Sequence, residues 1–159
     1  MENSIKNKTV FITGGSNGIG RSIVSLFCKN GANVIFCDID EQSGKQLCAE
    51  HAQYLCSFIK VDISNAETLT LALQNIIAKH GNIDIIINNA GVSRFGSILD
   101  VSVADFDKVL DINLRSVFIT AKTLAAHREN NAQLNTYGRI INMASTRYLM
   151  SEPDSEAYA

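Results

Sequence analysis

Short apolar runs alternate with amphipathic segments along the whole chain, and this alternation limits the possible folds more than any other feature. Five β-prone runs occur, at residues 9–13, 33–37, 55–61, 83–87 and 139–143. Between them, apolar residues recur at helical spacing in segments near 18–30, 41–52, 64–80 and 103–129. Strands that are apolar almost throughout are buried on both faces, and a helix after each strand makes neighbouring strands parallel. The pattern predicts an α/β fold with a doubly wound parallel sheet.

Capping residues and glycines indicate where the predicted helices begin and end. Gly31 ends the first helix, and Ser64 with Glu67 has the spacing of a capping box at the start of the third. Ser102, with Asp105 three residues later, opens the long fourth segment. We expect that segment to bend at least once before it ends near residue 129.

Composition and charge exclude several classes of protein. The chain has 159 residues, 46% of them hydrophobic and 19% charged, which suits one globular domain and excludes a disordered or fibrous chain. A net charge of −2 gives no general attraction to nucleic acid or to anionic membranes. The four cysteines have neither metal-ligand nor disulfide spacing. We therefore expect a cytoplasmic protein with reduced thiols, no metal site, and no nucleic-acid or membrane partner.

The segment 13–20, with the sequence TGGSNGIG, lies between the first predicted strand and the first predicted helix. Gly14 allows a tight turn, Gly18 lets a pyrophosphate approach the backbone, and Gly20 lets the helix pack closely on the strand. The free amides at the helix start, where Ser16, Asn17 and Ile19 also lie, attract phosphate. This context favours a dinucleotide-binding loop over a purely structural turn.

Asp38 ends the second predicted strand, eighteen residues after Gly20. A carboxylate at this position accepts hydrogen bonds from the hydroxyls of an adenosine ribose and repels a 2′-phosphate. NAD is therefore favoured over NADP. The alternative is that Asp38 or Asp40 only caps the following helix.

Four further segments, at 61–63, 88–91, 111–113 and 138–145, have a recognisable order and spacing relative to the glycine loop. With them, the chain resembles the short-chain dehydrogenase/reductase family over essentially its whole length. The resemblance implies a Rossmann-like fold, and it implies that Asp62 and Ile63 contact the adenine while Asn89, Ala90 and Gly91 line the ribose and nicotinamide side of the cleft. Asn88 is expected to tie neighbouring strand ends together. Capping alone is an alternative role for Asp62.

The same resemblance implies a reaction centre. Hydride transfer from an alcohol requires a base that removes the hydroxyl proton. In the family a tyrosine does this and a serine holds the substrate oxygen, and Ser145 and Tyr158 have the matching separation of thirteen residues. We expect the catalytic helix to begin at Asp154 or Ser155. Asn113 is expected, by analogy, to break its helix locally and to anchor a water in a proton relay.

The sequence departs from the family pattern at its end. A tyrosine hydroxyl ordinarily has a pKa of about 10 and needs a nearby cation to act as a base at neutral pH. The family supplies this charge with a lysine four residues after the tyrosine, whereas the sequence ends at Ala159. We therefore expect residues 1–159 to be one dinucleotide-binding domain that is incomplete within the first turn of the catalytic helix, and inactive by itself.

These observations predict an NAD-dependent oxidoreductase that interconverts a secondary alcohol and a ketone, and that forms a homo-oligomer when complete. A non-catalytic dinucleotide-binding or scaffold protein is the main alternative. A relative of the sugar-nucleotide epimerases is a more remote one, because the glycine spacing and residues 88–91 fit it less well.

Overall fold

A computed structural model describes the chain except for residues 1–4, 132, 135–136, 151, 156–157 and 159. Its sheet is parallel throughout and has the strand order β3-β2-β1-β4-β5. The strands are β1 (Thr9–Thr13), β2 (Asn33–Asp38), β3 (Cys56–Lys60), β4 (Ile85–Asn88) and β5 (Arg139–Asn142). The predicted doubly wound parallel α/β fold is therefore confirmed.

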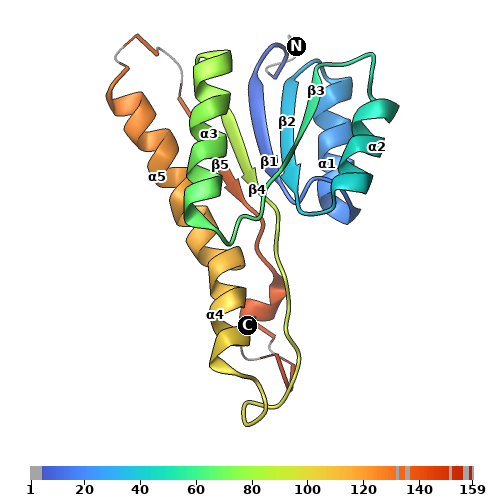
Figure 1. Cartoon of the computed structure of the whole chain (residues 1–159), viewed down its shortest axis with the longest axis vertical. Helices are drawn as coiled ribbons and strands as arrows, with labels where there is room; N and C mark the ends of the chain where they lie inside the picture. The colour runs from blue at the N-terminus through green and yellow to red at the C-terminus, as the bar shows by residue number, and fades with distance from the viewer. Residues whose placement is uncertain (1–4, 132, 135–136, 151, 156–157, 159) are drawn as a thin grey trace.

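Helices cover both faces of the sheet (Figure 1). One face carries α1 (Gly18–Lys29) and α2 (Glu41–Glu50), whereas the other carries α3 (Ala66–His80) and α5 (Ser116–Glu129). Between β4 and α5 the chain forms α4 (Val103–Leu110) and a single π-helical turn (Asp111–Arg115). A short 3₁₀ turn (Thr146–Tyr148) follows β5. In the described part of the chain, no helix combines the length and the apolarity that crossing a membrane would need.

Two apolar clusters, one on each face of the sheet, form the core. Phe11 and Ile35 point to the side of α3, where Leu73 packs against them, and Ile12 and Phe36 point to the side of α1 and α2. This alternation along each strand places successive side chains on opposite faces. Because both faces are covered, β1 is buried along its whole length.

The expectation that all five strands are buried on both faces is wrong for the two edge strands. All four residues of β5 are exposed, and β3 has only half-buried and exposed positions. Each of these strands has a neighbour on one side only within the described sheet. An apolar run in the sequence cannot reveal this, because burial depends on what lies beside the strand.

The start of α3 corrects a second prediction. The helix begins at Ala66 and is capped by Asn65, whose side chain accepts hydrogen bonds from the amides of Glu67 and Thr68. Ser64 is not the cap, because its hydroxyl and its amide both donate to the Asp62 carboxylate. At α4, by contrast, Ser102 accepts from the Asp105 amide at 3.1 Å as predicted.

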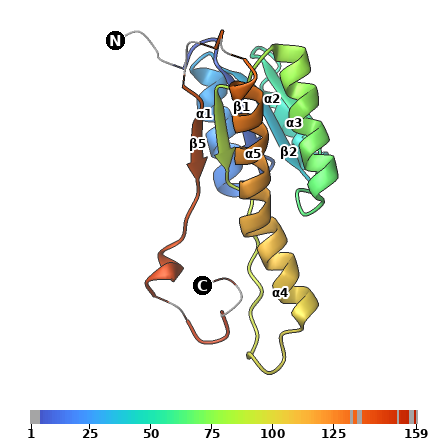
Figure 2. The same cartoon turned by 90° about the vertical axis from the view of Figure 1, so that its left-hand side faces the viewer.

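Beyond the carboxyl edge of the sheet, three segments lie alongside one another. They are the loop 89–101, α4, and the chain that follows β5, and all three extend past the strand ends in both views (Figures 1 and 2). In open α/β sheets, ligands bind at this edge, where the strand order reverses. Here the reversal falls between β1 and β4.

Candidate functional site

Two adjoining cavities lie at this edge of the sheet. One, of about 550 Å³, is lined by the glycine loop and by the ends of β2 and β3. The other, of about 530 Å³, is lined by the chain that follows β5, from Met143 onward. Both are bordered by the same five residues, Ile19, Asn89, Ala90, Gly91 and Val92. The two cavities therefore form one continuous cleft, whose halves we call the loop cavity and the β5 cavity.

The glycine loop has the backbone that the sequence predicted. Gly14 and Gly18 have φ values of 65° and 54°, in the left-handed region that side chains disfavour. A Cβ on Gly20 would lie 1.9 Å from the Gly14 carbonyl oxygen and 2.6 Å from the side-chain nitrogen of Asn89. Gly20 therefore allows α1 to start directly against the loop. Each of these glycines lines the loop cavity.

The amino end of α1 opens toward the same cavity. Asn17 is its N-cap residue, but the Asn17 side chain caps no amide and instead donates to Asp40 Oδ2 at 3.0 Å. The first turn carries no acidic residue. Its amides, and the positive end of the helix dipole, are thus available to an anion in the cavity.

Asp38 connects the end of β2 to the glycine loop. Its Oδ2 accepts from the Ser16 amide at 3.0 Å, and its Oδ1 accepts from the Asp40 amide at 3.1 Å. Asp38 lines the loop cavity. Ser16 does not, because it is fully buried with its hydroxyl 3.4 Å from the Asp40 carbonyl oxygen. Ser16 therefore holds the loop in place from behind.

Asp40, rather than Asp38, caps the next helix. Its Oδ1 accepts from the Ser43 amide at 3.0 Å at the start of α2. Hydrogen bonds from the Ser43 backbone, the Ser43 side chain and Asn17 hold the pKa of this carboxyl below its usual range. The capping alternative thus applies to Asp40, and Asp38 keeps its place at the cavity wall.

The ends of β2 and β3 complete the wall of the loop cavity. Asp62 and Ile63 line it, and the Asp62 carboxylate accepts from Ser64 rather than capping α3 itself. Cys37 lies beside them, and burial raises the pKa of its thiol to about 12, with the nearby Asp38 charge adding to the effect. Cys37 is therefore a neutral, unreactive part of the wall. Lys108 also lines this cavity, and no motif in the sequence pointed to it.

Asn89 joins β4 to the glycine loop. Its side-chain amide donates to the carbonyl oxygens of Thr13 and Gly14 at 3.1 and 3.0 Å. The Thr13 hydroxyl in turn accepts from the amides of Asn89 and Ala90, both at 3.1 Å. Sequence reasoning missed this role of Thr13, although its position directly before two glycines was a signal.

Asn88 joins β4 to β5, as predicted. Its side-chain nitrogen Nδ2 donates to Asn142 Oδ1 at 2.8 Å, and its own Oδ1 accepts from the buried Thr120 hydroxyl at 3.0 Å. The Met143 amide also donates to the Asn88 carbonyl oxygen. This network fixes the end of β5 against α5, so the residues that follow β5 start from a defined position.

Asn113 lies in the π-helical turn between α4 and α5. The expected local break in the helix is present there. The Asn113 side chain accepts from the Val92 amide and donates to the Val92 carbonyl oxygen, both at 2.9 Å. It thereby holds the loop after β4 as a neighbouring strand would, and Asn113 lines the β5 cavity.

Ser145 and Tyr158 both line the β5 cavity. Ser145 precedes the 3₁₀ turn, and its Oγ accepts from the Arg147 amide at 3.2 Å. The Tyr158 amide donates to the Ser155 carbonyl oxygen at 2.9 Å. Asp154 has a φ of 68°, which a helix does not allow. The prediction that the catalytic helix begins at Asp154 is therefore wrong. The alternative start at Ser155 would place the first turn partly on residues outside the described part of the chain.

The model of the family described as short chain dehydrogenase matches residues 8–159. The chain belongs to the short chain dehydrogenase family. A relative, the 3-beta-hydroxysteroid dehydrogenase of Comamonas testosteroni, is 36% identical over 91% of this chain and 55% of its own length. The chain spans 55 to 60% of the length of three curated relatives that it matches.

Two solved structures of the family carry different cofactors. The 3-ketoacyl-(acyl-carrier-protein) reductase from Brucella melitensis, complexed with NADH, matches with a TM-score of 0.88 and 28% identity, over 98% of this chain and 64% of that one. A metagenomic short-chain oxidoreductase in complex with NADP matches with a TM-score of 0.89 and 26% identity, over 98% and 70%. The family therefore supports a nicotinamide dinucleotide without deciding between its two forms.

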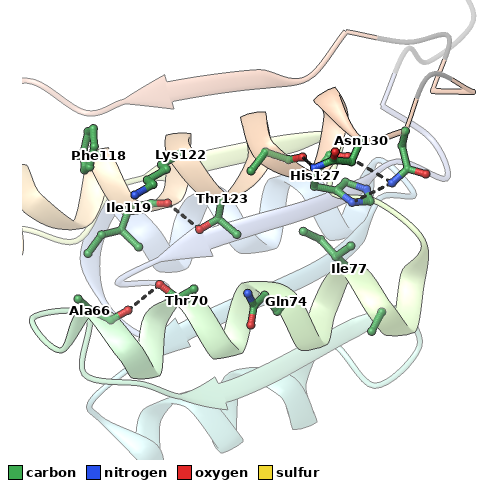
Figure 3. A pocket seen from close by; sticks show the side chains of 13 residues that line it. Ala66, Thr70, Gln74, Ile77, Phe118, Ile119, Lys122, Thr123, His127 and Asn130 are labelled. Carbon is green, nitrogen blue, oxygen red and sulfur yellow. Dashed lines mark hydrogen bonds between the residues drawn. The ribbon is translucent and has the colours of Figure 1, made fainter.

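A larger cavity, of about 690 Å³, lies between α3 and α5, away from the residues that the family resemblance singles out (Figure 3). Phe118, Lys122 and Thr123 border it from α5, and Thr70 and Gln74 from α3. The Lys122 ammonium lies 6.0 Å from the centre of the Phe118 ring, at the limit for a cation–π contact. None of the predicted site residues lines this cavity.

Proposed function

We propose that this short chain dehydrogenase is an NAD(H)-dependent oxidoreductase that interconverts a secondary alcohol and a ketone. The observation that supports the proposal is that Ser145, Tyr158 and Asn113 line one cavity that continues into the cleft beside the glycine loop. A catalytic centre of this type needs its acid/base group beside the nicotinamide end of the cofactor.

The residues of the loop cavity fit a nicotinamide dinucleotide. A pyrophosphate would lie at the amino end of α1, where Gly18 has no atom within 4 Å of a Cβ position. Asp38 would accept from the adenosine ribose, and its charge would oppose a 2′-phosphate. Bound there, the nicotinamide would supply the hydride acceptor or donor.

Ser145 and Tyr158 would handle the substrate oxygen. Ser145 Oγ already accepts from the Arg147 amide, so its hydroxyl hydrogen is left to donate to the substrate oxygen. Tyr158 would take the proton of the substrate hydroxyl during oxidation and return it during reduction. Val92 takes one donor and one acceptor of the Asn113 side chain, so a second N–H and a second lone pair are left for a water in the proton relay.

We also propose that the complete protein is a homo-oligomer. Leu114 and Phe118, on successive turns near the start of α5, are 63 and 65% exposed. Apolar side chains this open suit an interface with a second copy, and light scattering of the complete protein tests this. The cytoplasmic location stays a prediction from the sequence.

Expression of the complete coding sequence tests the proposed reaction. We expect NAD-dependent oxidation of members of a panel of secondary alcohols, and a loss of at least about 1,000-fold in kcat in Tyr158→Phe, since a base that acts in the transition state is removed. NAD binding measured by calorimetry should be nearly unchanged in that variant. Micromolar NAD binding without turnover of any alcohol would support the scaffold alternative instead.

A further inference from the structure

The β5 cavity contains one formal charge. Its lining, within the described residues, consists of apolar side chains, neutral amides and hydroxyls, together with the guanidinium of Arg147. No acidic residue is among them. A partly buried cation facing neutral walls attracts an anion more strongly than an exposed cation does, because water screens it less.

Arg147 is held in place by its neighbours. Its backbone amide donates to Ser145 Oγ, and its side chain is 28% exposed. One guanidinium nitrogen, Nη1, forms an ion pair with Glu152 Oε1. Glu152 is 59% exposed and does not line the cavity. Arg147 therefore stands two residues from the predicted oxygen-binding serine, with its counter-ion on the solvent side.

The other edge of the guanidinium is available. Nε and Nη2 have no partner among the described residues, and they point their N–H bonds in parallel along one edge of a planar group. Two parallel N–H groups match the two oxygens of a carboxylate, and this bidentate pairing is stronger and more selective than a single ionic contact. A dianionic phosphate usually has several cationic or amide partners, whereas Arg147 is the single cation among the described residues that line the cavity.

We propose that Arg147 binds a carboxylate of the substrate, so that the substrate class is the hydroxy acids and oxo acids. This inference rests on the proposed function, because it places the carboxylate in the same cavity as Ser145 and Tyr158. The substrate oxygen would lie at those two residues and the carboxylate at the Nε and Nη2 edge of Arg147. Glu152 would keep the guanidinium oriented and would turn toward water when the anion binds.

A matched set of five-carbon substrates tests the assignment on the complete protein with NAD. The set comprises 2-, 3- and 4-hydroxypentanoate, the three corresponding primary amides, and 2-pentanol. For the best regioisomer we expect kcat/KM for the acid to exceed that for its amide by about 10- to 100-fold, the range of a charge-assisted hydrogen-bonded pair. In Arg147→Gln this ratio should fall to about one, and Arg147→Lys should retain only part of it.

Two further variants separate anion binding from a structural role. Glu152→Gln breaks the ion pair but leaves the guanidinium, so the preference for the acid should be kept or raised. If Arg147 only tied down the segment 145–152, Glu152→Gln and Arg147→Gln would behave alike, which would overturn the inference. Arg139→Gln removes an arginine from the other end of β5 and should leave the ratio unchanged.

Binding of pentanoate to the NAD-loaded protein supplies a measurement that needs no turnover. We expect calorimetry to give a Kd at least about tenfold weaker in Arg147→Gln than in the wild type. Equal affinities, or tighter binding of butyl phosphate than of pentanoate, would overturn the carboxylate assignment. If 2-pentanol and the amides are oxidised without any preference for acids, the inference fails while the proposed function stands. If pentanoate binding depends on Arg147 but nothing is oxidised, the proposed function fails instead.

Discussion

The side-chain amide of Asn113 pairs with the main chain of Val92 through both of its ends, each at 2.9 Å. The pairing joins a π-helical turn to the loop that follows β4, across 21 residues of sequence. Because Val92 borders both halves of the cleft, this contact sets the position of the wall between them. It gives Asn113 a structural role that is independent of any part in the reaction.

Removing this contact should loosen the loop. We expect Asn113→Ala to lower the free energy of unfolding by about 1–3 kcal/mol, since it deletes one acceptor and one donor. Amide hydrogen exchange at Val92 should become faster. Asn113→Asp keeps the acceptor for the Val92 amide but places a charge against the carbonyl oxygen, so it should protect that amide better than alanine does. An unchanged exchange rate at Val92 in both variants would mean that the pairing does not form in solution.

The buried hydroxyl of Thr120 offers a second test. It lies 3.0 Å from Asn88 Oδ1 and 2.9 Å from the Val117 carbonyl oxygen of its own helix, and it is fully buried, so Thr120→Val would leave Asn88 Oδ1 without this partner. We expect a loss of about 1–3 kcal/mol in urea unfolding. Thr123→Val is the matched control, because the Thr123 hydroxyl bonds only the Ile119 carbonyl of its own helix, at 2.9 Å. Its cost should stay within about 0.5 kcal/mol, and equal losses would contradict a role for the link between β4 and α5.

Cofactor choice is expected to depend on the charge of Asp38. Asp38→Asn removes the charge that opposes a 2′-phosphate, so the ratio of kcat/KM with NADP to that with NAD should rise at least about tenfold, equivalent to ~1.4 kcal/mol. Asp40→Asn removes the same charge two residues away, at the cap of α2. In Asp40→Asn the ratio of kcat/KM with NADP to that with NAD should change by less than about threefold. The role given to Asp38 would be lost if the two variants shifted the ratio equally.

Acid should weaken one ion-pair cluster on the surface. Hydrogen bonds and charges from Lys45 and Lys60 lower the pKa of Glu41 from 4.5 to about 2. A carboxyl whose folded pKa is depressed stabilises the fold fully above its unfolded pKa, and this contribution is lost as the pH falls toward the folded value. The stability difference between the wild type and Glu41→Gln should therefore shrink from about pH 4.5 and be gone below about pH 2.

Salt and a matched variant identify the cause of that difference. Added salt should reduce it at neutral pH, because Glu41 is exposed. Glu67→Gln removes another first-turn carboxylate, that of α3. The Glu67 carboxylate forms no ion pair within the described residues. If Glu67→Gln showed the same pH dependence, the helix dipole rather than the two lysines would explain the effect.

The sequence by itself determined the order and type of the elements, because these follow from local patterns. Apolar runs, helical spacing and the TGGSNGIG segment predicted the parallel sheet and the tight turn at Gly14, whereas the positive φ of Gly18 came only with the structure. The cap of α3 shows the limit of such patterns, because the sequence predicted Ser64 and the structure has Asn65. Both residue types cap helices well, and the choice was made by the Asp62 carboxylate, which takes up both donors of Ser64.

Only the tertiary structure decided which residues far apart in the sequence contact one another and which are buried. The pairing of Asn113 with Val92, the support of the glycine loop by Thr13 and Asn89, and the exposure of β5 all depend on which segments lie side by side. Hydrogen bonds and burial are properties of pairs and neighbourhoods, so residues 21 to 76 positions apart leave no local signal of their contact. The sequence named many residues of the cleft but not Lys108, and the folded chain alone determined that Ser16 supports the loop from behind while Asp38 and Arg147 face the cleft.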